Sequence, residues 1–157
     1  MHIFIRVLIV FTLCLPGALA GAEEISGMAR VIDGDTLELV GQRINLIGID
    51  APELSQSCTW PNKEIPCGDI SRTALLDLIA ATPVVCVRRQ LTDNGTWIAL
   101  CTADGFDVGR NMVHTGWALA VPGGLTGYET TEASAHAAKR GLWRGEFVLP
   151  WVWRRQI

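Results

Sequence analysis

The stretch that decides the fold is residues 31–53, VIDGDTLELVGQRINLIGIDAPE. It contains two segments of β-forming and large apolar residues, 36–40 and 43–49, joined at Gly41-Gln42. This composition predicts a β-hairpin. Two acids precede its first strand and two follow its second strand: Asp33, Asp35, Asp50 and Glu53.

The predicted hairpin would bring these four acids into one small space, because the ends of antiparallel strands remote from the turn lie side by side. Four carboxylates repel one another unless a cation lies among them. Oxygen ligands on irregular backbone suit Ca²⁺ best. An ordinary alternative remains open, since Asp-Gly and Asp-Ala-Pro-Glu are also common turn sequences.

The N-terminal residues 1–20 have the pattern of a secretory signal peptide. One cation, Arg6, precedes an apolar run over residues 7–15, and Ala18-Leu19-Ala20 resembles a cleavage site. The run is short for a transmembrane anchor. We therefore expect an exported protein, periplasmic or secreted, with no membrane span after cleavage and one domain over residues 21–157.

The charge balance disfavours a general nucleic-acid binder, which is usually basic. Without Arg6, 12 Lys and Arg stand against 16 acids, a formal charge of about −4. Two arginine pairs, Arg88-Arg89 and Arg154-Arg155, leave a local positive patch possible. Nucleic acid is thus a possible but disfavoured partner, and we expect a monomer.

Four cysteines follow the predicted cleavage site, and an even number in an exported protein indicates disulfides. Pairing of Cys58 with Cys67 would close a loop rich in turn residues. Pairing of Cys86 with Cys101 follows from a predicted hairpin whose turn is centred between residues 93 and 94, which places the two cysteines opposite each other. A zinc site is the alternative interpretation of the four cysteines, although the sequence contains no CxxC pair.

The order of predicted elements is three strands, helix, two strands, helix, short strand, helix. Five strands with a helix after the third suggest an α+β fold built on a five-stranded OB-fold β-barrel with three helices. The predicted ranges are strands 25–32, 36–40, 43–49, 83–90, 97–102 and 117–121, and helices 70–81 (capped by Asp69), 107–116 (capped by Asp107) and 128–140.

These motifs resemble the staphylococcal nuclease, or thermonuclease-like, family. The resemblance rests on I-D-G-D-T (residues 32–36) and I-D-x-P-E (residues 49–53), and extends over roughly residues 25–153. It also includes the D-G-x-D motif at 104–107, Gly-Trp-Ala at 116–118 and Arg-Gly-Leu-Trp at 140–143. It implies a phosphodiester hydrolase of DNA and RNA that uses one Ca²⁺.

The resemblance also implies a role for each matching residue. Asp35 and Asp50 would bind Ca²⁺ directly, with the backbone carbonyl of Ala51, and Asp33 would support the ion indirectly. Glu53 would position or deprotonate the attacking water. A carboxylate that orients a nucleophile beside a polarising cation is sound chemistry for this reaction.

Two departures concern the arginines that the family uses to neutralise charge on the phosphate. Asn45 and Thr96 stand at those positions, and neither side chain can grip a phosphate with two charged donors. Arg43 is a possible substitute, because it lies two residues before Asn45 on the same strand face. The family's stacking aromatics are also missing, at Asn94 and over residues 122–125.

The sequence therefore predicts an exported thermonuclease-like domain that keeps an acidic metal pocket and lacks guanidinium groups beside it. We expect weak or absent nuclease turnover and a binding or accessory role. The alternatives are an active Ca²⁺-dependent endonuclease with relocated arginines, or an accessory protein of exopolysaccharide (succinoglycan) biosynthesis, as some exported members of the family are named.

Overall fold

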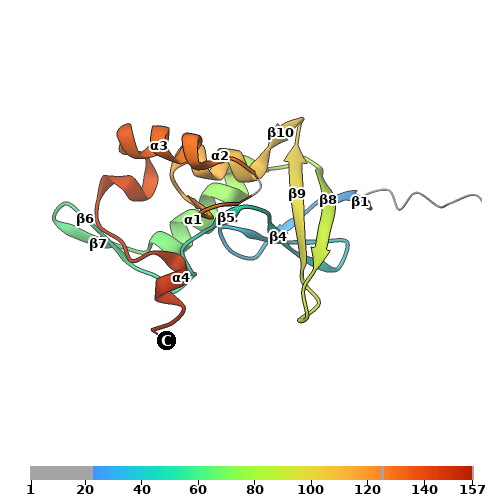
Figure 1. Ribbon diagram of the computed structural model, residues 1–157, viewed down its shortest axis with the longest axis horizontal. Helices are drawn as coiled ribbons and strands as arrows, with labels where there is room; N and C mark the ends of the chain where they lie inside the picture. Colours follow the sequence, from blue (N-terminus) through green and yellow to red (C-terminus); the bar gives the residue numbers. More distant parts are fainter. Residues whose placement is uncertain (1–22, 125, 157) are drawn as a thin grey trace, which may run out of the picture.

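The computed structural model describes residues 23–124 and 126–156. The predicted signal peptide, residues 1–20, lies outside the described residues. The main sheet has the strand order β1-β8-β9-β4-β3-β2, with β10 paired to β9. Figure 1 shows β8 and β9 as the long arm of this sheet, with α1, α2 and α3 gathered to one side of it.

The sheet is antiparallel except where β4 runs parallel to β9. Its strands are β1 (Glu24–Gly27), β2 (Arg30–Val31), β3 (Thr36–Leu39), β4 (Gln42–Leu46), β8 (Val84–Leu91), β9 (Trp97–Ala103) and β10 (Phe106–Asp107). The curled sheet with helices packed against it is the α+β, OB-fold barrel that the sequence predicts. Two of the six predicted strands are interrupted: 25–32 becomes β1 and β2, and 43–49 becomes β4 and β5 (Ile49–Asp50).

The central hairpin is formed by β3 and β4, with Leu37 opposite Ile44 and Thr36 opposite Asn45. Its turn is Val40-Gly41, one residue earlier than predicted, and both residues have positive φ (52° and 73°). Two successive positive φ angles match the right-handed twist of the flanking strands, which explains the tight connection. Leu37, Leu39 and Ile44 are fully buried in the main core.

The second hairpin, β8 and β9, places Cys86 opposite Cys101 as predicted. These residues form one disulfide, and Cys58 and Cys67 form the other. The sequence predicted both pairs. The register of β8 shifts at Arg89, between Arg88 and Gln90, without disturbing the cysteine pair.

The three predicted helices are present: α1 (Cys67–Leu78), α2 (Val108–Thr115) and α3 (Glu129–Ala137). Asp107 caps α2 by accepting a hydrogen bond from the Arg110 amide, and Gly116 ends that helix with a left-handed conformation, both as predicted. The predicted cap at Asp69 is wrong, because α1 begins at Cys67, three residues before the predicted start at residue 70, and Asp69 therefore lies inside its first turn. The negative charge of Asp69 there still favours the positive end of the helix dipole.

The sequence missed several short elements. The predicted loop 51–67 contains a small hairpin, β6 (Cys58–Trp60) and β7 (Lys63–Ile65). The predicted short strand 117–121 is present as β11 (Leu119–Ala120), which pairs with β5. The C-terminal segment forms a 3₁₀ helix, η1 (Gly141–Arg144), and a short helix, α4 (Pro150–Trp153). A second core cluster, with Cys58, Cys67, Leu119 and Leu142 at its centre, packs this segment against the small hairpin and α1.

Four of the six tryptophans pack on that second cluster: Trp60, Trp117, Trp143 and Trp151. They therefore cover a core. Within the residues that the structure describes, no helix has both the length and the apolar character needed to span a bilayer.

Candidate active site

The predicted site residues, apart from Ala51 and the disulfide cysteines, line one cavity of about 490 Å³. Its wall includes all four acids of the two motifs, both substituted positions and two arginines. The lining residues are Asp33, Asp35, Asp50, Glu53, Asn45, Thr96, Arg43 and Arg154, with Thr36, Ile49, Asn94 and Val121 between them. This wall contains no aromatic side chain, so the pocket offers no surface for base stacking.

The loop before β3 presents the first two acids. The Asp35 amide donates to Asp33 Oδ1 at 3.1 Å, which fixes a tight turn around Gly34. A Cβ on Gly34 would lie 2.0 Å from Ser71 Oγ and 2.7 Å from the Ala51 Cβ. Only glycine fits between α1 and the second acidic loop, which explains the Gly of the Asp-Gly-Asp motif.

The Asp35 carboxylate points toward the second motif. Its Oδ2 accepts the Ala51 amide at 2.8 Å, and its Oδ1 accepts the Thr36 hydroxyl at 2.8 Å. Burial raises the pKa of Asp35 to about 8, and the neighbouring charge of Asp33 adds to this effect. A carboxylate in these surroundings is stabilised in its charged form by a cation.

Asp50 and Ala51 are held by the pairing of β5 with β11, in which Asp50 lies opposite Leu119. Both residues are buried, so the Asp50 carboxylate has few contacts with solvent. A buried carboxylate needs a charged or hydrogen-bonding partner. The Asp35–Ala51 hydrogen bond and this strand pairing bring the first and second acid pairs to the same pocket.

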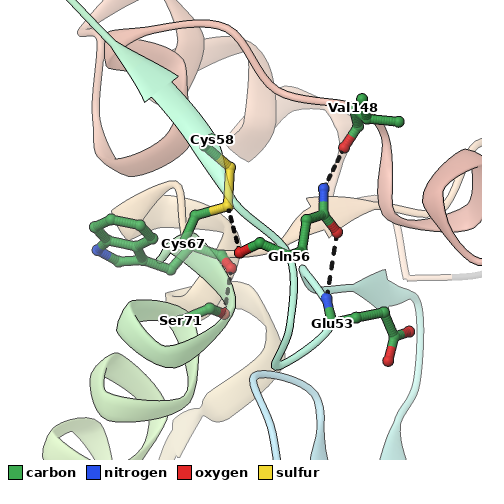
Figure 2. Close-up of a disulfide and its surroundings, with 7 residues drawn as sticks. Glu53, Gln56, Cys58, Cys67, Ser71 and Val148 are labelled. Carbon is green, nitrogen blue, oxygen red and sulfur yellow. Dashed lines mark hydrogen bonds between the residues drawn. A yellow bond between two sulfur atoms is a disulfide. The ribbon is translucent and has the colours of Figure 1, made fainter. Parts of the chain in front are cut away.

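Glu53 lies on a loop that packs directly on the start of α1. A Cβ on Gly68 would lie 1.8 Å from the Glu53 carbonyl oxygen, so this contact requires glycine. The fully buried Gln56 side chain accepts a hydrogen bond from the Glu53 amide through Oε1 at 3.3 Å. Its Nε2 donates a hydrogen bond to the Val148 carbonyl at 2.6 Å. Figure 2 shows Gln56 between the Glu53 loop and the C-terminal segment, beside the Cys58–Cys67 disulfide.

The expectation that no guanidinium lies beside the acids is wrong. Arg154, just after α4, donates Nη1 to Asp50 Oδ1 at 2.8 Å and Nη2 to Asp50 Oδ2 at 2.6 Å. The same Nη1 donates to Glu53 Oε1 at 2.7 Å. The hydrogen bonds to Asp50 and Glu53 raise the pKa of Arg154 above its usual value, and the bonds to Asp50 contribute most. The two-pronged pair with Asp50 is the geometry that guanidinium and carboxylate favour.

Arg43 and Asn45 project into the same pocket, as their spacing on β4 predicts. Arg43 Nη2 lies 3.8 Å from Asp33 Oδ2, and about half of its side chain (53%) is exposed, so this contact is loose. Asn45 Oδ1 accepts the Thr36 hydroxyl at 3.2 Å. Thr96 is buried, and its amide and carbonyl both bond to Thr92.

The donor chemistry of the pocket fits a hard divalent cation. Asp35, Asp50 and the Ala51 carbonyl would supply the oxygen ligands. The four carboxylates and two guanidinium groups that line the cavity give it a formal charge of −2. Among residues 23–124 and 126–156, however, no three His, Cys, Asp or Glu side chains are gathered closely enough to hold a metal ion. Ion binding at Asp50 therefore requires the guanidinium of Arg154 to give up at least part of its contact.

The curled sheet and its acidic pocket define an OB-fold domain with four carboxylates gathered at one cavity. A family model described as "Staphylococcal nuclease homologue" matches residues 43–145. The chain belongs to the staphylococcal nuclease family, a family of phosphodiester hydrolases. Asp33, Asp35 and Arg154 lie outside the matched residues.

Several relatives share much of the chain. A Rhizobium meliloti (strain 1021) protein named "Succinoglycan biosynthesis protein ExoI" is 35% identical over 129 residues, which is 80% of this chain and 68% of the relative. An Escherichia coli O157:H7 protein named "Uncharacterized endonuclease" is 31% identical over 137 residues, 82% of this chain and 84% of the relative. An Oryza sativa subsp. japonica protein named "Probable staphylococcal-like nuclease CAN2" is 33% identical over 116 residues, 72% of this chain and 29% of the relative.

Arg154 is the pocket residue that sequence reasoning missed. The Arg154-Arg155 pair was visible as a local cluster of positive charge, but 104 residues separate Arg154 from Asp50. Spacing along the chain gives no indication of such a contact. Arg88, by contrast, lies outside the pocket: it is buried, bonds to Gln42 and Glu23, and lies over the Trp97 ring.

Proposed function

We propose that the protein is an exported Ca²⁺-dependent phosphodiesterase that cleaves single-stranded nucleic acid slowly. The observation that carries this proposal is the pocket itself, in which the four acids of both motifs line one cavity together with a guanidinium. Sequence alone favoured a weak or inactive protein. The arginine in the pocket supports retained activity, and the relatives named as nucleases support the substrate class.

In the proposed reaction, Asp35, Asp50 and the Ala51 carbonyl hold Ca²⁺, and Asp33 fixes the loop that carries Asp35. When bound, the ion polarises the phosphate and lowers the cost of the developing negative charge. Glu53 orients a water molecule and accepts its proton. The water oxygen forms a bond to phosphorus, the bond from phosphorus to the ester oxygen breaks, and that oxygen takes a proton from solvent.

The rate should be low because Asn45 and Thr96 supply no charged donors. An arginine that stabilises a phosphoryl transition state contributes about 10³–10⁵ in rate where it has been tested. The net acidity of the chain makes a short, single-stranded substrate more suitable than a duplex, whose charge density is higher.

The proposal is tested by incubating the purified protein, residues 21–157, with single-stranded DNA in Ca²⁺, with and without chelator. We expect slow cleavage that chelator abolishes. Asp35→Ala should remove the activity, whereas Asp77→Ala, an exposed acid on α1 outside the pocket, should not. Absence of chelator-sensitive cleavage in the wild-type protein would refute the hydrolase and favour a binding role.

Export is part of this proposal. The signal-like residues 1–20 and the two disulfides support folding in an oxidising compartment. Expression of the full-length chain with cell fractionation tests it. We expect mature protein, beginning near Gly21, in the periplasm or the medium; intact protein confined to the cytoplasm would contradict export.

A second candidate is an accessory role in exopolysaccharide biosynthesis, favoured by the relative named for succinoglycan biosynthesis. Deletion of the gene and measurement of secreted acidic polysaccharide tests this candidate. Loss of polysaccharide that an Asp35→Ala copy restores would assign the role to a function independent of hydrolysis, whereas unchanged polysaccharide would remove the candidate.

A further inference from the structure

Arg154 contacts two residues to which the proposed reaction gives separate tasks. Asp50, the proposed ion ligand, accepts hydrogen bonds from both terminal nitrogens of the Arg154 guanidinium. Glu53, the proposed base, accepts a hydrogen bond from one of them. The Asp50 side chain is 10% exposed and that of Arg154 is 44% exposed. The guanidinium therefore has one edge against the buried acids and the rest toward the open part of the cavity.

The guanidinium has capacity for a further ligand. The three hydrogen bonds to Asp50 and Glu53 use three of its five N–H groups. A planar fork with free donors beside a cation-binding pocket suits a phosphate group, which accepts two parallel hydrogen bonds. Asn45 and Thr96 line the same cavity, so Arg154 faces the space from which the family's two arginines are missing.

We propose that Arg154 is the substrate-phosphate-binding arginine of this pocket, supplied by the C-terminal segment in place of the missing strand arginines. The proposal rests on the proposed function above. In the ligand-free protein the guanidinium neutralises Asp50 and Glu53. With Ca²⁺ held at Asp50 that pair would weaken, the two N–H groups that bond to neither acid would bind the phosphate, and Glu53 would be free to contact the water.

The C-terminal segment is held firmly enough to present this side chain. Pro150 is buried at the first position of α4, and the Arg154 amide donates to its carbonyl at 3.0 Å. Trp151 packs on the second core cluster. Gln56 ties Val148 to the Glu53 loop, so the segment that carries Arg154 and the loop that carries Glu53 are fastened at one point (Figure 2).

Arg43 is the competing candidate, and the contacts favour Arg154. Arg43 makes one ion pair, at 3.8 Å, with Asp33, and more than half of its side chain is exposed. A long exposed side chain loses considerable rotamer entropy when it binds a ligand. Arg154 is already ordered by three short bonds to the acids that surround the reacting phosphate.

The experiment measures binding of a phosphorothioate single-stranded DNA oligonucleotide, which resists cleavage, by fluorescence anisotropy in saturating Ca²⁺. Arg154→Ala should weaken binding about 10- to 100-fold, because a charged hydrogen-bond pair to phosphate is lost. Arg155→Ala removes the same charge from the next, exposed residue and should change binding less than about threefold. Arg154→Lys keeps the charge but not the fork, and should fall between the two.

Calorimetric titration with Ca²⁺ distinguishes phosphate binding by Arg154 from a purely structural role in which Arg154 only holds the C-terminal segment in place. Arg154→Ala should bind Ca²⁺ at least as tightly as wild type, since a competing cation is removed. Equal weakening of DNA binding by Arg154→Ala and Arg155→Ala, no effect of Arg154→Ala, or loss of both DNA and Ca²⁺ binding would overturn the proposal.

Failure of the two proposals can be told apart. A wild-type protein that binds the oligonucleotide in Ca²⁺ but does not cleave unmodified DNA would refute the hydrolase, and the Arg154 comparison would still be decided. A wild-type protein that does not bind the oligonucleotide would overturn both. If Arg154→Ala does not fold, Arg154→Lys decides the question, and binding equal to wild type would count against the fork.

Discussion

At the scale of single residues, the pocket combines a preserved acidic set with replaced cations. Asp33, Asp35, Asp50 and Glu53 face one cavity, and the hydrogen bond from the Ala51 amide to Asp35 joins the two motifs. Asn45 lies in the same cavity but is uncharged. The activity of the pocket should therefore respond more to added positive charge than to changes in the acids' surroundings.

Asn45→Arg should raise cleavage of single-stranded DNA by at least about tenfold, because a guanidinium on β4 would face the phosphate. Initial rates at saturating Ca²⁺ measure the effect. Thr73→Arg, which adds the same charge at an exposed position of α1, serves as the control. An equal increase in both variants would indicate general attraction of DNA rather than a restored contact.

Gly68→Ala should displace the Glu53 loop, since the new Cβ would lie 1.8 Å from the Glu53 carbonyl oxygen. We expect a loss of about 1–3 kcal/mol in the free energy of unfolding, typical of overpacking, together with lower activity of the folded protein. Urea denaturation and initial rates measure the two effects. Thr73→Ala on the same helix should leave both nearly unchanged; a stable, fully active Gly68→Ala would show that the loop relaxes.

At the scale of elements, the two disulfides stabilise different structures. Cys86–Cys101 joins the neighbouring strands β8 and β9 across 15 residues, within the main core cluster. Cys58–Cys67 joins β6 to the start of α1 across nine residues, and the amide of Gly68, the residue after Cys67, donates to the Gln56 carbonyl at 3.1 Å. The second disulfide therefore borders the network that holds Glu53.

Replacing both cysteines of a pair by alanine should separate stability from activity. The chain-entropy relation gives a loss of about 3 kcal/mol for Cys86–Cys101 and about 2.5 kcal/mol for Cys58–Cys67. Denaturant unfolding measures these losses. Activity per folded molecule should fall only when Cys58 and Cys67 are replaced. An equal fall in both double variants would contradict the claim that the Cys58–Cys67 disulfide supports the Glu53 loop.

At the scale of the whole molecule, the C-terminal segment completes the pocket. Gln56 and Val148 are 92 residues apart in sequence, and Asp50 and Arg154 are 104 apart. Both contacts depend on the second core cluster, in which Leu142, Trp143 and Trp151 pack beside the small hairpin. The barrel supplies the acids, and a distant segment supplies the cation.

Gln56→Leu should loosen this connection, because it leaves the Glu53 amide and the Val148 carbonyl without a side-chain partner. We expect a loss of about 2–3 kcal/mol in the free energy of unfolding and weaker binding of the phosphorothioate oligonucleotide. Gln90→Leu, at an exposed position of β8, is the matched control. Unchanged oligonucleotide binding in Gln56→Leu would show that α4 holds Arg154 without this tie.

The sequence by itself determined what depends on neighbouring residues. Alternating apolar residues and turn residues gave the two hairpins, the spacing of the turn predicted the Cys86–Cys101 pair, and Asp107 and Gly116 marked the ends of α2. The two acidic motifs identified one wall of the pocket, because each motif acts over a few residues and the hairpin between them is short.

Only the tertiary structure decided which cation faces those acids. The position of Arg154 follows from the packing of α4 on a core built by residues far apart in the chain, and backbone propensities do not extend over such distances. The same reason explains the missed β6–β7 hairpin, whose strands are three residues long and are stabilised by a disulfide and aromatic packing rather than by their own β-propensity.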